Sequence, residues 1–166
     1  MSMKNNVISD KSISIPSLER LEQIADQADI SDPEILPFFE EEAAQELSKI
    51  ESILQAWHTT PCGCPGRLDD LRVNLHTLKG AANSVGQLRI GSLTGGLKDV
   101  LDTLKPEQAT AMRSDLTKII IAVTEAVKAL LLEARAPQYN RARKKLILQA
   151  VNSILDFQEK CRLLDC

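Results

Sequence analysis

The chain has 166 residues, of which 43% are hydrophobic, 26% are charged and 3% are aromatic, with a formal net charge of −3. This length predicts one domain with a sizeable core. The slight acidic excess and the scarcity of aromatic residues argue against nucleic-acid binding, which needs clustered Lys and Arg or a base-stacking surface. The first residues do not resemble a signal peptide, and no apolar run is long enough to cross a membrane. We therefore expect a cytoplasmic protein without nucleic-acid or membrane partners.

Residues 1–16 are polar and predict a flexible N-terminal arm, with a short amphipathic helix expected to follow it. The next helix carries apolar residues at helical spacing, namely Leu36, Ala43, Leu47, Ile50, Leu54 and Trp57. Ser31 or Asp32 can cap this helix, with Pro33 in its first turn. The ring of Pro37, however, would clash with a carbonyl one turn earlier. We therefore expect a kink or a later start near Pro37.

The segment PCGCPG ends this helix and contains two of the four cysteines. Cytosolic thiols are usually reduced, which argues against disulfides there or at Cys161 and Cys166. His58, Cys62 and Cys64 are potential zinc ligands, but their C-x-C spacing differs from the C-x₂-C of common zinc modules. A fourth ligand would also have to come from the far end of the chain. We therefore favour a reduced loop rich in Pro and Gly, and expect no bound metal.

The rest of the chain keeps the apolar period of helices and shows no alternating strand pattern. We predict helices over about 67–84 and 88–104, a further helix that opens at Pro106, and a last helix after the break APQYN. Their predicted core residues are Leu93, Leu97, Leu101, Leu104, Ala109, Met112, Leu116, Ile119, Val123, Val127, Leu130, Leu146, Ala150, Ile154, Phe157 and Cys161. Short loops between long helices make neighbours antiparallel. The expected fold class is all-α: an antiparallel up-and-down four-helix bundle with an additional C-terminal helix and a short N-terminal helix.

The helix predicted over about 67–84 has an unusual polar face. Its apolar residues, Leu71, Leu75, Leu78, Ala82 and Val85, form one stripe, and His76 points away from that stripe. Lys79, Gly80 and Asn83 follow His76 at helical spacing and share its face. A glycine inside a helix costs roughly 1 kcal/mol relative to alanine, and close approach of another surface is a physical reason to keep one. The plain alternative is an exposed histidine beside an ordinary lysine.

The segment HTLKGAANSVG resembles the signature of histidine phosphotransfer (HPt) domains, and the fitting residues are His76, Thr77, Leu78, Lys79, Gly80, Ala81, Ala82, Val85 and Gly86. The resemblance covers roughly residues 34–133 and implies a bundle that carries a phosphoryl group on His76 to or from receiver-domain aspartates. Neutral imidazole is a nucleophile at pH 7, and Lys79 can orient and screen the added charge. The chain then divides into the arm 1–16, an HPt bundle over 17–133 that includes the leading helix, and an accessory helix over 134–166.

This chain departs from the similar phosphoacceptor domain of chemotaxis-type kinases on the following helix. In that domain a histidine and a glutamate hydrogen-bond to the phosphoacceptor imidazole, and the corresponding residues here are Gly95 and Lys98. The departure favours the hybrid-kinase relay type. Lys98 either supplies a second positive group to the phosphate or is a solvated helix lysine. We interpret Gly95 and Gly96 as a second flat surface, and assign partner docking to Gly80, Asn83, Gly95 and Lys98.

The resemblance implies a stoichiometric phosphoryl carrier without turnover of its own. Its expected partners are response-regulator receiver domains, and a hybrid histidine kinase is a further candidate. No cofactor is expected on this chain, and Mg²⁺ is expected in the receiver. We expect a monomer or weak self-association through the last helix, whose basic cluster RARKK is interpreted as a solvated face. Two alternatives stay open: a phosphoacceptor module of a larger chemotaxis-type kinase, disfavoured because no nucleotide motif is present, and a helical docking protein without phosphotransfer.

Overall fold

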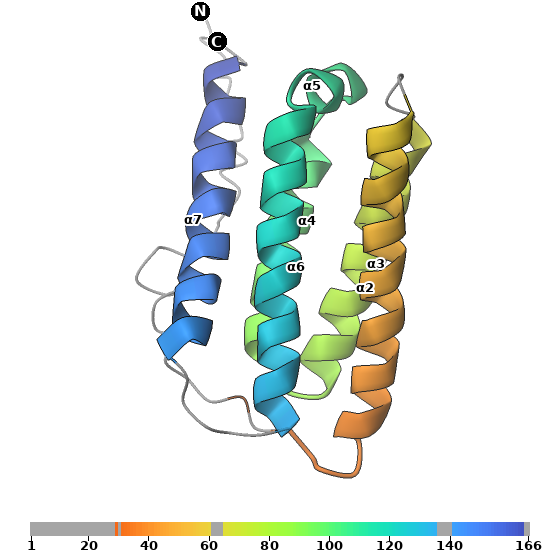
Figure 1. The fold of residues 1–166 in the computed structure, drawn as a ribbon, viewed down its shortest axis with the longest axis vertical. Helices are drawn as coiled ribbons and strands as arrows, with labels where there is room; N and C mark the ends of the chain where they lie inside the picture. The colour runs from red at the N-terminus through yellow and green to blue at the C-terminus, as the bar shows by residue number, and fades with distance from the viewer. Residues whose placement is uncertain (1–28, 30, 61–64, 136–140, 165–166) are drawn as a thin grey trace, which may run out of the picture.

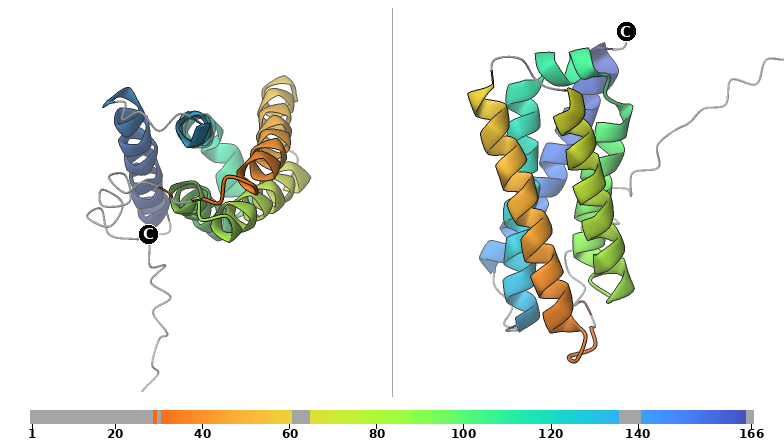
Figure 2. Two further views of the ribbon diagram at one scale, coloured as in Figure 1. Left: turned by 90° about the horizontal axis from the view of Figure 1, so that it is seen from below. Right: turned by 90° about the vertical axis from the view of Figure 1, so that its right-hand side faces the viewer.

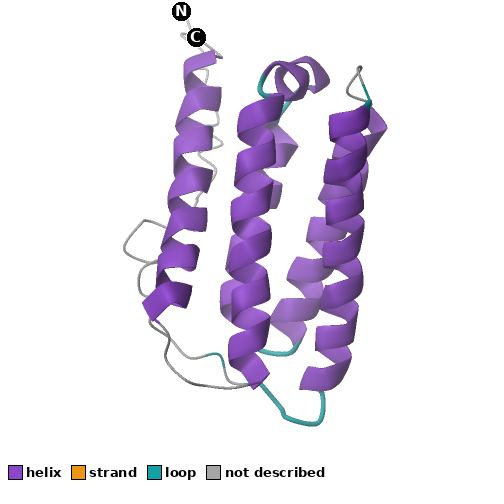
Figure 3. Ribbon diagram, viewed as in Figure 1, coloured by secondary structure: helices purple, strands orange, loops and turns teal. Residues whose placement is uncertain are grey.

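The computed structural model describes residues 29, 31–60, 65–135 and 141–164. Every element in these ranges is a helix, as Figure 3 shows. The helices are α2 (Leu36–Thr59), α3 (Pro65–Ser84), α4 (Leu88–Thr103), α5 (Pro106–Ala111), α6 (Arg113–Arg135) and α7 (Arg141–Leu164). The predicted all-α fold class is confirmed. The N-terminal arm, the predicted leading helix, Cys62, Cys64, Cys166 and the APQYN segment lie outside the described residues.

Helices α2, α3, α4 and α6 form an antiparallel bundle, and the short helix α5 lies at one end of it, before α6 (Figure 1). The C-terminal helix α7 packs against α6 and α4 (Figure 2). It contributes to the common core through Ile147, Ala150, Val151, Ile154, Phe157 and Cys161. The last helix is therefore covered along its apolar stripe by the bundle. In the part of the chain that is described, no helix is both long and apolar enough to cross a membrane.

The start of α2 confirms the expected effect of Pro37. This proline lies in the first turn of the helix, where its missing N–H and its ring do not disturb a helical hydrogen bond. The predicted capping of α2 by Ser31 or Asp32 is wrong, because the N-cap position is Ile35. Asp32 instead accepts a hydrogen bond from the N–H of Glu34 at 2.9 Å, and so stabilises the turn before the helix. A helix that began at Asp32 would bring the ring of Pro37 against a carbonyl one turn earlier.

The turn between α3 and α4 explains Gly86. Its φ of 79° lies in the left-handed region that glycine adopts at low cost. The N–H of Gly86 donates to the carbonyl of Asn83 at 3.3 Å, and the N–H of Gln87 donates to that of Ala82 at 2.8 Å. Together these bonds form a Schellman motif, which ends α3 at Ser84 as predicted. Because the turn is short, α4 returns directly along α3.

The helix predicted from Pro106 is divided in two. The backbone of Met112 has φ −98° and ψ 17°, which departs from helical values and separates α5 from α6. The predicted core positions from Ala109 to Leu130 are nevertheless buried in both helices. A break of one residue leaves the apolar period almost unchanged, which is why the sequence pattern does not reveal it.

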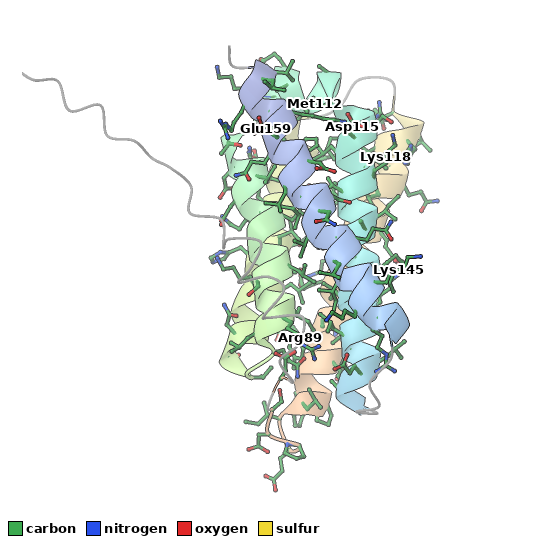
Figure 4. The ribbon with its side chains drawn as sticks, turned by 90° about the vertical axis from the view of Figure 1, so that its left-hand side faces the viewer. Arg89, Met112, Asp115, Lys118, Lys145 and Glu159 are labelled. Atoms are coloured by element: carbon green, nitrogen blue, oxygen red, sulfur yellow. The ribbon has the colours of Figure 1, made fainter. Side chains whose placement is uncertain are left out.

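A cluster of charged side chains is buried at the end of the bundle where α4 begins, opposite the end that holds Met112 (Figure 4). We name it the Arg89 cluster, and it consists of Arg89, Asp29 and Glu133. The guanidinium of Arg89 binds Asp29 at 2.8 Å and Glu133 at 2.9 Å, and its side chain is 7% exposed. Burial lowers the pKa of Arg89, but the hydrogen bonds to Glu133 and Asp29 outweigh burial and leave the pKa above its usual value. Every charge in this cluster is paired.

Candidate functional site

The orientation predicted for α3 is confirmed by the burial of its residues. Its apolar residues lie inside the bundle, with Leu71, Leu75, Leu78 and Ala82 buried and Val85 partly buried. His76, Gly80 and Asn83 are exposed, and Lys79 is partly buried. The imidazole of His76 therefore lies on a helix and in contact with solvent.

Gly80 leaves an open surface beside His76. A Cβ built at Gly80 would meet no atom within 4 Å, and among the described glycines only Gly86 has positive φ. Neither packing nor backbone conformation within the described chain therefore requires glycine at this position. Alanine would favour the helix by about 1 kcal/mol. The docking role predicted for Gly80, close approach of another molecule, stays a prediction.

Lys79 crosses from α3 to α4 above Gly95. A Cβ built at Gly95 would lie 3.1 Å from Cε of Lys79 and 3.3 Å from its Nζ, so the glycine makes room for the lysine side chain. Among the residues that the structure describes, no carboxylate pairs with Lys79. The lysine is thus held in place by its apolar stem while its positive charge stays available.

The interpretation of Gly95 and Gly96 as a flat surface for a partner is wrong. Gly95 is buried beneath Lys79. Gly96 faces the last helix instead, where a Cβ would lie 3.6 Å from Cδ1 of Ile154. Successive helix positions point in directions about 100° apart, so the two glycines serve two different neighbours. Gly91, which sequence reasoning missed, acts like Gly95, because the side chain of Asn83 occupies the space beside it.

These contacts define how α3 and α4 face each other. Asn83 lies against Gly91 and Lys79 lies against Gly95. Two turns further along, Arg72 reaches the C-terminal end of α4, where its Nε is 3.6 Å from Asp102. Because the helices are antiparallel, residue numbers fall along α3 as they rise along α4. The segment of α3 from Lys79 to Arg72 therefore lies opposite the segment of α4 from Gly95 to Asp102.

His76 and Lys98 are at matching positions in this register. Each lies on the face of its own helix that borders the other helix, at helical spacing from the contact residues named above. Lys98 is not the freely solvated lysine of the plain alternative: its side chain is 21% exposed and its Nζ binds Oδ2 of Asp102 at 2.5 Å. A role of Lys98 toward a phosphate or a partner stays a prediction.

Arg72 anchors the end of α4, and the sequence pattern did not reveal this role. Its Nε and Nη2 donate to the carbonyl of Leu101, and Nη2 also donates to that of Leu104 at 3.0 Å. Carbonyls at a helix C-terminus lack helical partners, so a cationic donor is favourable there. Nη1 donates to Asp69 at 2.7 Å. The guanidinium of Arg72 is therefore held in place at the end of α4.

The surroundings of His76 are positively charged. The site offers an exposed imidazole, an available ammonium on Lys79 and a second ammonium on Lys98 that is held by Asp102. In the described ranges, no group of His, Cys, Asp and Glu side chains has the arrangement of a metal site. Positive groups beside a nucleophile suit an anionic transferred group.

Comparison with known proteins identifies the family of the chain. The family model described as "Hpt domain" matches residues 34–136, from just before α2 to just after α6. One similar curated protein is the chemotaxis protein CheA of Treponema pallidum (strain Nichols), which is 27% identical over 113 residues. The similar segment is 68% of this chain and spans 14% of the length of that relative. No solved structure matches the chain.

Proposed function

We propose, on the premise that this chain belongs to the Hpt domain family, that His76 carries a phosphoryl group to and from receiver-domain aspartates. Histidine phosphotransfer in two-component signalling is what an Hpt domain implies. The observation that carries the residue assignment is the position of His76. It is exposed on α3, next to the open surface of Gly80 and one turn from Lys79, which has no carboxylate partner among the described residues.

In the proposed transfer, the free ring nitrogen of His76 attacks the phosphorus of an aspartyl phosphate in the receiver. The P–N bond forms as the P–O bond to the aspartate breaks, and the aspartate leaves as a carboxylate. Lys79 faces the incoming negative charge and orients the group. Gly80 allows the receiver to approach the helix closely. The magnesium ion belongs to the receiver in this proposal, and this chain acts as a stoichiometric carrier.

A receiver-partnered relay, with a hybrid histidine kinase as a further candidate partner, is favoured by the residues at two positions of α4, where a chemotaxis-type phosphoacceptor domain has a histidine and a glutamate. Neither Gly95 nor Lys98 can accept a proton from the imidazole, as the glutamate of a chemotaxis-type phosphoacceptor domain would. The similarity to a chemotaxis protein supports a second candidate, a phosphoacceptor module that a chemotaxis-type kinase phosphorylates directly. The two candidates differ in the donor of the phosphoryl group.

A phosphotransfer assay tests both candidate functions. The full chain is mixed with radiolabelled phospho-receivers of the host, and separately with a chemotaxis-type kinase and labelled ATP. We expect label from a receiver that is acid-labile, base-stable and absent in His76→Gln. His58→Gln is the matched control, because His58 is the other histidine and is also exposed. Label from the kinase alone would favour the second candidate, and binding without label from either donor would favour a docking protein.

A further inference from the structure

We infer that Asp102 competes with the phosphoryl group for Lys98. In the unphosphorylated protein Asp102 holds the ammonium of Lys98, and after phosphorylation of His76 Lys98 moves from Asp102 to the phosphoryl oxygens. Asp102 is then a positioning residue that acts through Lys98. The inference rests on the proposed role of His76 and deepens it.

The packing of α3 against α4 brings Lys98 within reach. The contacts of Lys79 with Gly95 and of Arg72 with Asp102 place Lys98 at the level of His76 across the helix boundary. Packed helices have axes about 8–10 Å apart, a distance that a lysine side chain and a phosphohistidine can together span. Lys98 is partly exposed, so its ammonium can move without being drawn out of the core.

The ion pair between Lys98 and Asp102 is of a kind that a stronger anion can break. Lys98 and Asp102 are four residues apart on α4, and the carboxylate is 43% exposed. Pairs of this kind at a helix surface are weak. A phosphoryl group offers more negative charge and more acceptor oxygens than a carboxylate, so it binds the ammonium more strongly. Phosphorylation of His76 therefore favours movement of the Lys98 ammonium from Asp102 to the phosphoryl oxygens.

Asp102 keeps one positively charged neighbour when Lys98 moves away. Its other oxygen lies 3.6 Å from Nε of Arg72. Arg72 is held in place by the carbonyls of Leu101 and Leu104 and by Asp69, so it remains beside Asp102 while Lys98 moves. The rearrangement thus involves one flexible side chain and leaves the end of α4 intact.

The two lysines near His76 therefore differ in availability. Lys79 lacks a carboxylate partner in the described part of the chain and faces the phosphoryl group at once. Lys98 binds the phosphoryl group only after its ion pair with Asp102 has broken. The phosphorylated state is therefore stabilised less than it would be if both lysines were unpaired. This competition keeps the phosphoryl group transferable to the next receiver.

The test uses the full chain, phosphorylated on His76 with phosphoramidate, which needs no receiver. The readouts are the ¹⁵N resonance of the Lys98 ammonium and the ³¹P pH titration of the phosphohistidine. We expect the Lys98 resonance to shift on phosphorylation. Because a nearby cation favours the dianion, Asp102→Asn should lower the titration midpoint by about 0.3–0.7 pH unit, which corresponds to a two- to five-fold change in the ionisation constant. Asp102→Glu keeps the carboxylate and should retain the wild-type midpoint.

Lys98→Ala distinguishes competition from direct repulsion between Asp102 and the phosphoryl group. Lys98→Ala should raise the midpoint, and adding Asp102→Asn to it should have no further effect. An equal effect of Asp102→Asn in both backgrounds, or an unchanged Lys98 resonance on phosphorylation, would overturn the inference. Failure of every receiver to donate to His76 would instead contradict the proposed function, since chemical loading does not depend on a receiver.

Discussion

The Arg89 cluster and the face around His76 are both polar regions of α4 and its neighbours, but their charges are arranged differently. The guanidinium of Arg89 is enclosed and bound by carboxylates of Asp29 and Glu133. Beside His76, Lys79 is held over Gly95 without a carboxylate partner among the described residues, and Gly80 leaves open space. Charge that is satisfied within the chain holds segments together, whereas charge left unsatisfied at an exposed nucleophile is available to a ligand.

The largest expected effect is on the Arg89 cluster. Arg89→Met should lower the free energy of unfolding by about 3 kcal/mol, because it removes the guanidinium that binds the buried carboxylate of Asp29 and the partly buried one of Glu133. Denaturant unfolding measures this loss, and phosphorylation of His76 by phosphoramidate should be unchanged at a temperature where the variant is folded. Lys118→Met is the control, since its side chain is 76% exposed, and it should change stability by less than about 0.5 kcal/mol. Equal effects of the two variants would contradict the structural role of the cluster.

Gly80→Ala should have effects of opposite sign on stability and function. We expect the variant to be more stable by about 0.5–1 kcal/mol, because alanine fits the open space and favours the helix. Transfer from a phospho-receiver should be slower, because the added methyl group lies where the partner approaches. Gly66→Ala is the matched control on the same helix, since Gly66 is also exposed and has no neighbour within 4 Å of the added Cβ. If Gly80→Ala accepts the phosphoryl group at the wild-type rate, the proposal that Gly80 permits close approach of a receiver is wrong.

Lys79→Ala should change function more than stability. No carboxylate in the described ranges pairs with Lys79, so we expect a change in unfolding free energy below about 0.5 kcal/mol. The loaded fraction of His76 at equilibrium with a phospho-receiver should fall by up to about five-fold, the limit for one exposed charge interaction. If the loaded fraction stays the same and stability falls instead, Lys79 belongs with the structural charges, as Arg89 does.

The smallest effect concerns Asp115 on α6, which binds Lys160 on α7 at 3.0 Å. The hydrogen bond from Lys160 lowers the pKa of Asp115 below its usual value. Its contribution to stability is therefore present above the ordinary aspartate pKa of about 3.9, and is lost as pH falls through the lower pKa of the folded state. Because this carboxylate is exposed, Asp115→Asn should cost only a few tenths of a kcal/mol at pH 7, by about the surface-pair magnitude. Unfolding at pH 7 and pH 2 measures it, and a difference that persists at pH 2 would rule out the ion pair as its cause.

The sequence by itself determined the all-helical fold, the buried face of α3 and the outward direction of His76, but not the break at Met112 that separates α5 from α6. These features depend on local spacing, because an apolar residue every three or four positions marks the side that must leave water. The family assignment also came from one continuous segment, HTLKGAANSVG. The docking roles of Gly80 and Asn83 stay predictions.

Only the tertiary structure decided which residues face each other. Gly95 and Gly96 are adjacent in sequence, yet one accommodates Lys79 and the other faces Ile154. Asp29, Arg89 and Glu133 come together from distant segments, and no local pattern marks them as partners. Lys98 and Asp102 are four residues apart on the same helix, but only the packing of α3 against α4 places Lys98 at the level of His76. The reason is physical: a periodic pattern gives the direction of a side chain from its own helix, but the register between packed helices decides what that side chain meets.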